Sequence, residues 1–166
     1  EAEVPLSNGR KMFLLGTIDR VDVCEEDDRV LMRVIDYKSG AKKFEMEDFY
    51  YGLELQLIIY MNAAEEIYHK ETEKEVTPAG VFYYQLQDPI VKADHAEEES
   101  LLKNFRMSGM ANSDGDILNK LEAPAGDFLS MPVRLKKSGE PYKNSPVMGT
   151  QDFHYMGGYA KRKAAE

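Results

Sequence analysis

Two aspartates and a lysine stand at positions where they could act together on a phosphate group. Asp36 and Lys38 are two residues apart in an alternating apolar stretch, so on a β-strand both side chains share one face. Asp19 falls on the apolar face of an earlier alternating stretch. Carboxylates are costly to bury unless a cation compensates them. The three residues therefore predict either a metal site or a buried ion pair.

The two alternating stretches, residues 11–24 and 29–37, are separated by four acidic residues and predict a β-hairpin. If the acidic tetrapeptide forms the turn, Asp19 lies opposite Val34 and diagonal to Asp36. Diagonal Cβ atoms are about 7 Å apart, a gap that one cation ligated by two carboxylates can bridge. The hairpin is thus expected to form a clamp for Mg²⁺, with Mn²⁺ as a second candidate.

Two interpretations of this trio stay open at the level of the residues. In the first, Lys38 simply compensates the acids as a salt bridge. In the second, the acids hold Mg²⁺ and Lys38 orients or activates water and offsets the charge that develops on a phosphate. The second interpretation predicts cleavage of a phosphodiester bond.

Residues 48–70 carry apolar side chains at helical spacing and predict a helix, with Asp48 as its N-cap. Gln56 falls on the apolar stripe of this helix, where its amide needs a partner, so we expect it to point at the site. The alternative is a glutamine at the margin of the stripe that faces water. Residues 81–84 then predict a strand, which completes a strand-helix-strand crossover.

The remaining elements predict one α/β domain over residues 1–166, with a central mixed β-sheet flanked by helices. We expect a helix over about 97–107, a short helix after Ser113, a strand over about 128–136, a turn at Ser138 and Gly139, and a last helix from about Thr150.

The chain of 166 residues has 21 Lys and Arg against 30 Asp and Glu, a formal net charge of −9. Such a balance excludes a surface that binds nucleic acid over its whole area, because that requires many clustered cations. It permits a local basic site. Lys42 and Lys43, which follow Lys38 closely, are expected to contact substrate, although solvated surface charge is the alternative.

The longest purely apolar run, residues 57–61, is far shorter than the roughly 20 residues of a membrane-spanning helix. We therefore expect no membrane partner. Cys24 is the single cysteine, which gives no disulfide framework, and a cytoplasmic location is expected.

Three ordered motifs carry a resemblance. Residues 16–22 (GTIDRVD), residues 34–40 (VIDYKSG) and the pair Gln56 and Tyr60 in QxxxY spacing resemble the RecB-type branch of the PD-(D/E)XK nuclease superfamily. Three later segments, 78–84 (PAGVFYY), 87–90 (QDPI) and 105–109 (FRMSG), resemble the C-terminal nuclease domain found in the B-type component of bacterial helicase-nucleases, the AddB type. The similarity covers nearly the whole chain.

The resemblance implies a restriction-endonuclease-like core and a role for each motif residue. Asp19 and Asp36 correspond to the metal-binding acids of the family, and the main-chain carbonyl of Tyr37 would be a further ligand. Lys38 would be the catalytic lysine. Gln56 and Tyr60 would help to position the water, the lysine and the DNA strand.

The resemblance also implies a larger machine. Family members work with a partner, the A-type helicase component, which unwinds DNA ends with ATP, and the nuclease domain cuts a resulting single strand during recombinational repair. They carry an iron-sulfur cluster on four cysteines, which this chain cannot hold with Cys24 alone. We expect a fragment of a larger polypeptide that lacks those cysteines and an upstream helix with a metal-site residue. This fragment could be inactive by itself, and a scaffold that binds DNA or the partner helicase without catalysis is the alternative function.

Overall fold

The computed structural model describes residues 2–6, 8–86, 105–122 and 128–166. Its strands are β1 (Ala2–Pro5), β2 (Lys11–Leu14), β3 (Arg20–Glu25), β4 (Arg29–Lys38), β5 (Glu75–Gln85), β6 (Ser108–Asn112) and β7 (Val147–Met148). Its helices are α1 (Met46–Tyr50), α2 (Gln56–Thr72), α4 (Gly115–Leu121) and α5 (Thr150–Ala164).

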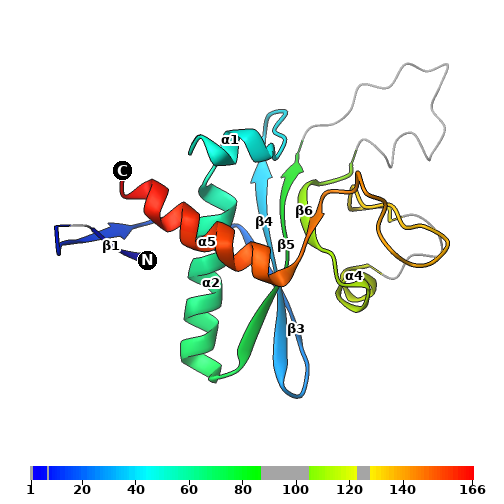
Figure 1. Ribbon diagram of the computed structural model, residues 1–166, viewed down its shortest axis with the longest axis horizontal. Helices are drawn as coiled ribbons and strands as arrows, with labels where there is room; N and C mark the ends of the chain where they lie inside the picture. Colours follow the sequence, from blue (N-terminus) through cyan, green and yellow to red (C-terminus); the bar gives the residue numbers. More distant parts are fainter. Residues whose placement is uncertain (1, 7, 87–104, 123–127) are drawn as a thin grey trace.

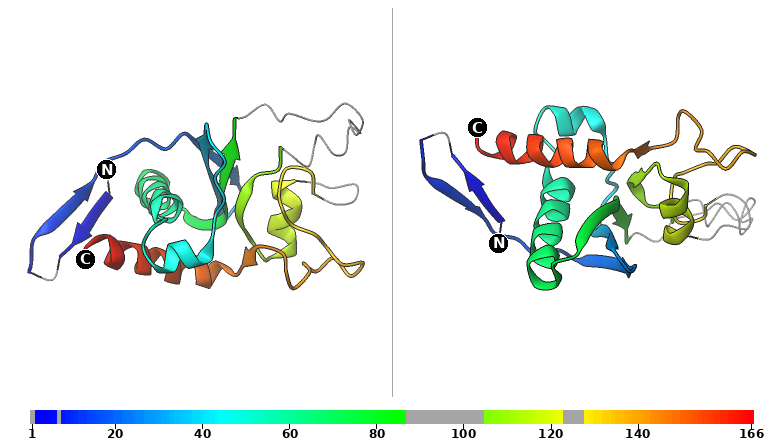
Figure 2. Two further views of the ribbon diagram at one scale, coloured as in Figure 1. Left: turned by 90° about the horizontal axis from the view of Figure 1, so that it is seen from above. Right: turned by 60° about the horizontal axis from the view of Figure 1, so that its bottom comes forward.

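A mixed five-stranded sheet in the order β3-β4-β5-β6-β7 forms the centre of the fold. Strand β4 pairs antiparallel with β3 and parallel with β5, so α2 is the crossover between two parallel neighbours. Figures 1 and 2 show α2 and α5 on one side of the sheet and α4 on the other. The predicted α/β fold with a mixed sheet and flanking helices is confirmed.

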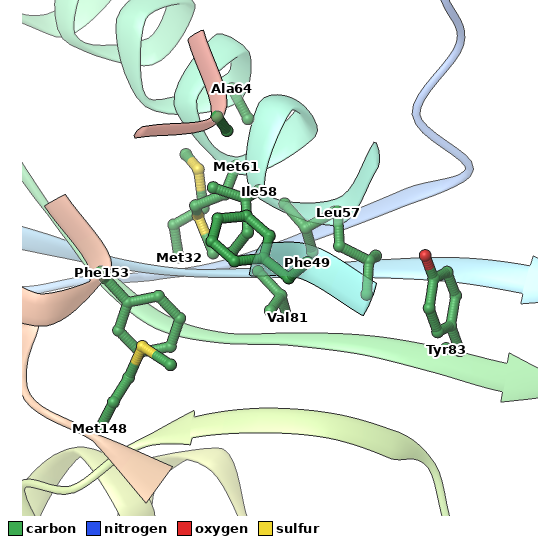
Figure 3. Packing of buried hydrophobic residues seen from close by; sticks show 12 residues of the cluster. Met32, Phe49, Leu57, Ile58, Met61, Ala64, Val81, Tyr83, Met148 and Phe153 are labelled. Carbon is green, nitrogen blue, oxygen red and sulfur yellow. The ribbon is translucent and has the colours of Figure 1, made fainter. Parts of the chain in front are cut away.

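Strand β4 is apolar on both faces because helices cover both sides of the sheet. Its Val34 packs with α2 and α5 in the larger core cluster, and its Ile35 packs with β6 and α4 in a second cluster. Figure 3 shows the larger cluster, in which Tyr83 lies nearest the arrow tips of the strands. The core therefore fixes the end of β4, where Asp36 and Lys38 stand.

The continuous strand predicted over residues 11–24 is wrong. Strand β2 pairs with β1 in a separate two-stranded sheet, and β3 begins only at Arg20. Gly16 lies between the two strands, and a Cβ at Gly16 would be 3.3 Å from the Tyr60 ring. Alternation of apolar residues indicates strands but not their partners, which explains the error.

The single helix predicted over residues 48–70 is also wrong, since it is divided into α1 and α2. Gly52 has φ of 79°, and the N–H groups of Gly52 and Leu53 donate to the carbonyls of Phe49 and Asp48. This pattern is a Schellman motif, which ends α1. Helix α1 begins at Met46, so Asp48 is not its N-cap.

The C-terminal half differs from the prediction in its strands. Residues 128–136 form no ladder, apart from an isolated bridge between Leu135 and Pro141, because Pro132 has no N–H and the N–H groups of Leu129 and Ser130 donate to Glu122. Strands β6 and β7 were not predicted, and β5 is longer than residues 81–84.

The predicted short helix is confirmed as α4, where the Asp114 side chain caps the N–H groups of Asp116 and Ile117. The turn at Ser138 and Gly139 and the start of α5 at Thr150 are confirmed as well. The helix predicted over 97–107 lies mostly outside the described residues, and residues 105–107 are not helical.

Gly109 sits where β6 and β5 come closest, and a Cβ there would overlap the Val81 carbonyl oxygen and lie 2.8 Å from Cα of Phe82. We predict that Gly109→Ala lowers the free energy of unfolding by about 3 kcal/mol, because backbone atoms must move apart. Thermal unfolding of the purified chain measures this. Gly115→Ala, whose Cβ meets no atom within 4 Å, is the control, and equal melting temperatures for both variants would contradict the prediction.

Glu65 on α2 gives stability a pH dependence. Burial raises the pKa of Glu65 from its ordinary 4.5 to about 7. Between these values the folded chain binds more protons at Glu65 than the unfolded chain does, so its contribution to stability falls as pH rises from 4.5 to 7.

We predict that Glu65→Gln raises the free energy of unfolding at pH 8 by about 1 to 3 kcal/mol, because no charge is then buried. Chemical denaturation of variant and unaltered chain at pH 4.5, 6 and 8 tests this through the difference between the two. Glu71→Gln is the control, since Glu71 lies on the same helix and is exposed. If the difference in unfolding free energy between the Glu65→Gln variant and the unaltered chain were the same at all three pH values, the predicted titration of Glu65 would be ruled out.

Candidate active site

The end of β4 brings the predicted acid and lysine together. The Asp36 side chain is 5% exposed and faces the α2 side of the sheet with Val34. Lys38 is the last residue of β4, and its Nζ atom lies 2.6 Å from Oδ2 of Asp36. An ion pair between Lys38 and Asp36, one of the two interpretations that the sequence left open, is therefore present.

Helix α2 supplies the next two predicted residues. Gln56 is its first residue and Tyr60 follows one turn later. The Gln56 side chain accepts a hydrogen bond from Nζ of Lys38 at 3.0 Å and donates one to the Tyr60 hydroxyl at 2.9 Å. Gln56 thus points toward Lys38, as predicted, and the four polar side chains form one continuous contact chain.

Asp19 reaches the same end of β4 from outside the strand ladder. Its Oδ2 atom accepts a hydrogen bond from the backbone N–H of Tyr37 at 2.9 Å. This carboxylate takes the place of a β3 carbonyl, because β3 pairs with β4 only as far as the Arg20 and Ile35 pair. Asp19 is therefore fixed beside residue 37 by a backbone contact.

The predicted hairpin register is wrong. Glu25 pairs with Val30 rather than Cys24 with Arg29, because the turn is tighter and is closed by a hydrogen bond from the Glu26 N–H to the Arg29 carbonyl. Asp19 consequently does not lie opposite Val34. It precedes β3, and its exposed carboxylate approaches β4 from the edge.

The oxygen donors at this edge fit a hard cation. Oδ2 of Asp36 is buried and accepts no hydrogen bond of regular geometry from the described residues. The Tyr37 carbonyl points to the same strand edge as its N–H, which donates to Asp19. No group of three His, Cys, Asp or Glu side chains in the described ranges forms a metal cluster. Two carboxylates suit Mg²⁺, which keeps several waters.

Tyr83 lies beneath two ammonium groups. It pairs with Asp36 in the β4–β5 register and is 2% exposed. Its ring centroid is 5.3 Å from Nζ of Lys38 and 6.0 Å from Nζ of Lys42. Burial, and then the nearby Asp36 charge, raise the pKa of Tyr83 to about 12, so it stays a neutral phenol that favours cations over its ring.

Glu54 is a site residue that sequence reasoning missed. Its side chain is 3% exposed and forms an ion pair with Lys42, which is thereby fixed near Lys38. The sequence signal that could have revealed it is a glutamate between the two apolar residues Leu53 and Leu55. Because one continuous helix was predicted over residues 48–70, the position of Glu54 in the turn before α2 was not recognised. Lys43, by contrast, is exposed and lies away from this pair in a separate groove.

These features define a class of protein. The family model described as the PD-(D/E)XK nuclease superfamily matches residues 1–144. The chain belongs to this superfamily, and its acid, lysine and glutamine lie together at one end of the central sheet.

The relatives are more specific, and each is named as the B subunit of an ATP-dependent helicase/deoxyribonuclease. The chain is 36% identical over 171 residues to that of Clostridium tetani, covering 98% of this chain and 15% of the relative. The protein of the same name from Thermoanaerobacter sp. (strain X514) is 38% identical over 165 residues, covering 96% of this chain and 14% of that protein. The protein of the same name from Alkaliphilus metalliredigens is 34% identical over 177 residues, covering 100% of this chain and 15% of that protein. The chain thus spans about a seventh of their length.

The Lys42–Glu54 pair yields a stability prediction. Lys42→Met leaves the Glu54 carboxylate buried without its partner, which we expect to cost about 3 to 5 kcal/mol. Adding Glu54→Leu removes that charge and should restore most of the loss. Urea denaturation of the unaltered chain, both single variants and the double variant gives the coupling energy. Additive effects would show that the two side chains do not interact.

Proposed function

We propose that this chain is the nuclease unit of a helicase-nuclease complex, where it hydrolyses phosphodiester bonds of single-stranded DNA. The observation that carries the proposal is the contact chain from Asp36 through Lys38 to Gln56, which joins β4 to α2 at the sheet end. Membership of a nuclease superfamily and relatives named as helicase/deoxyribonuclease components support it. As part of such an assembly it would act in DNA repair with the A-type helicase component.

In this proposal Asp19, Asp36 and the Tyr37 carbonyl hold Mg²⁺, or Mn²⁺ in its place. The cation supplies Lewis-acid polarisation of the scissile phosphate. Hydrolysis adds a water oxygen to phosphorus and breaks one ester bond, and the departing oxygen takes a proton and leaves as a hydroxyl.

The side chains have separate tasks. Nζ of Lys38 offsets the negative charge that develops on the phosphate oxygens, which is most effective where donors are already oriented. Gln56 keeps that ammonium in place because its side-chain oxygen accepts from Lys38 while its nitrogen donates to Tyr60. Lys42, held by Glu54, places a second ammonium near Lys38 as a hydrogen-bond donor to the bound strand.

The competing function is a scaffold that binds DNA or the partner helicase without cleaving. The Lys38–Asp36 ion pair is compatible with it, because Lys38 compensates the buried acid. A scaffold, however, has no need for the buried Asp36 carboxylate, since an apolar residue would cost less free energy to bury there. We therefore favour hydrolysis.

We predict that Asp36→Asn lowers the rate of single-stranded DNA cleavage at least about 100-fold, because the main cation ligand is lost. Cleavage of a labelled oligonucleotide with Mg²⁺ or Mn²⁺ is the measurement. Asp28→Asn in the distant hairpin turn is the matched control and should cut like the unaltered chain.

Calorimetric titration of either cation provides a readout besides cleavage. The unaltered chain should bind, and the variant carrying both Asp19→Asn and Asp36→Asn should not. Cleavage by Asp36→Asn at the unaltered rate would remove this site from consideration. Binding of DNA without any cleavage or cation binding would favour the scaffold.

Within the described residues, no helix combines the length and the apolar character needed to cross a bilayer.

A further inference from the structure

A groove lies beside the candidate active site, on the β6 side of the loop over residues 39–45. It has a volume of about 360 Å³. We call it the basic groove, and it is lined by Lys43, Phe44, Gln85, Arg106, Met107, Ser108, Gly109, Pro132 and Pro146. Two of these described lining residues are cations and none is an acid, although the chain as a whole carries a formal charge of −9. This local reversal of charge favours an anionic ligand.

Arg106 gives the groove a fixed positive charge. Its Nη2 atom donates to the Phe128 carbonyl at 2.9 Å and its Nε atom donates to the Leu129 carbonyl at 3.3 Å. Carbonyls position the guanidinium without cancelling its charge, and among the described residues no carboxylate forms an ion pair with Arg106. A guanidinium held in this way is suited to bind a phosphate.

The loop over residues 39–45 lies between the groove and the candidate active site. Gln85 pairs with Lys38 in the β4–β5 register and donates from Nε2 to the Lys42 carbonyl at 3.2 Å. The Phe44 N–H donates to Oγ of Ser108 at 2.9 Å. The loop is therefore anchored to both β5 and β6. On this loop Lys42 lies over the Tyr83 ring and Lys43 lines the groove.

We propose that the basic groove binds the phosphodiester backbone of single-stranded DNA next to the scissile phosphate. The strand passes from Asp36 and Lys38 over the anchored loop, where Lys42 and then Lys43 contact it, and reaches Arg106 in the groove. The inference rests on the proposed function and adds a binding site for the strand beyond the cleavage site. It also gives a role to the FRMSG segment, whose Arg106 lies outside the cleavage site.

Site-directed cross-linking tests this path, because Cys24 is the single cysteine and is exposed. In a Cys24→Ser background, the thiol of Lys43→Cys should displace the leaving thiol of an activated disulfide that is tethered to the backbone of a single-stranded oligonucleotide, which links protein and DNA through a new disulfide. Lys70→Cys in the exposed last turn of α2 is the matched control. We expect at least a tenfold higher yield at position 43 than at position 70, and equal yields would overturn the proposal.

Binding strength is a second measurement that does not depend on cleavage. It uses the Asp36→Asn chain and a fluorescent oligonucleotide over a series of salt concentrations. Lys43→Ala should lower the slope of log affinity against log salt by about 0.7, the value for one phosphate contact on a single strand. An unchanged slope would contradict the groove, and Lys70→Ala should leave the slope unchanged.

The two proposals fail in different ways. If the unaltered chain cleaves single-stranded DNA and Lys43→Ala changes neither KM nor the salt slope, the groove is wrong and the nuclease stands. If Lys43→Ala weakens DNA binding but Asp36→Asn cleaves at the unaltered rate, the nuclease site is wrong and the groove stands. Absence of any DNA binding by the unaltered chain would overturn the groove directly.

Discussion

The buried carboxylate of Asp36 is the constraint on which the site depends. It stands at the end of a core strand on a side chain that is 5% exposed, where an uncompensated negative charge would be strongly unfavourable. Lys38 lies two residues later on the same face and provides the nearest positive charge. Gln56 then holds Lys38, which requires that the first turn of α2 lies over the end of β4. The crossover between β4 and β5 produces this placement.

A second buried acid repeats the same physical solution nearby. Glu54 is almost fully covered and is compensated by Lys42, whose ammonium, like that of Lys38, lies over the Tyr83 ring. Each buried carboxylate therefore fixes a lysine that would otherwise be a mobile surface side chain. Each of these two ion pairs is neutral, so the positive charge of this region comes from Lys43 on the anchored loop and from Arg106.

Local sequence patterns predicted an element correctly where they were compatible with only one type of secondary structure. Strand β4 is apolar on both faces, α4 carries an Asp114 cap, and α5 begins where predicted. Errors arose where the pattern was compatible with two structures. Alternation did not distinguish one strand from two, and helical spacing continued across Gly52 although its left-handed backbone ends α1.

The sequence by itself determined that Asp36 and Lys38 share a face, because side chains on a strand alternate, and its motifs indicated a nuclease superfamily. Only the tertiary structure decided how the other residues reach them. Asp19 approaches through the Tyr37 N–H rather than along a strand, Gln56 contacts Lys38 across a crossover, and Glu54 joins through Lys42. These contacts connect elements far apart in the chain, and their geometry depends on strand register and helix packing, which no local pattern encodes.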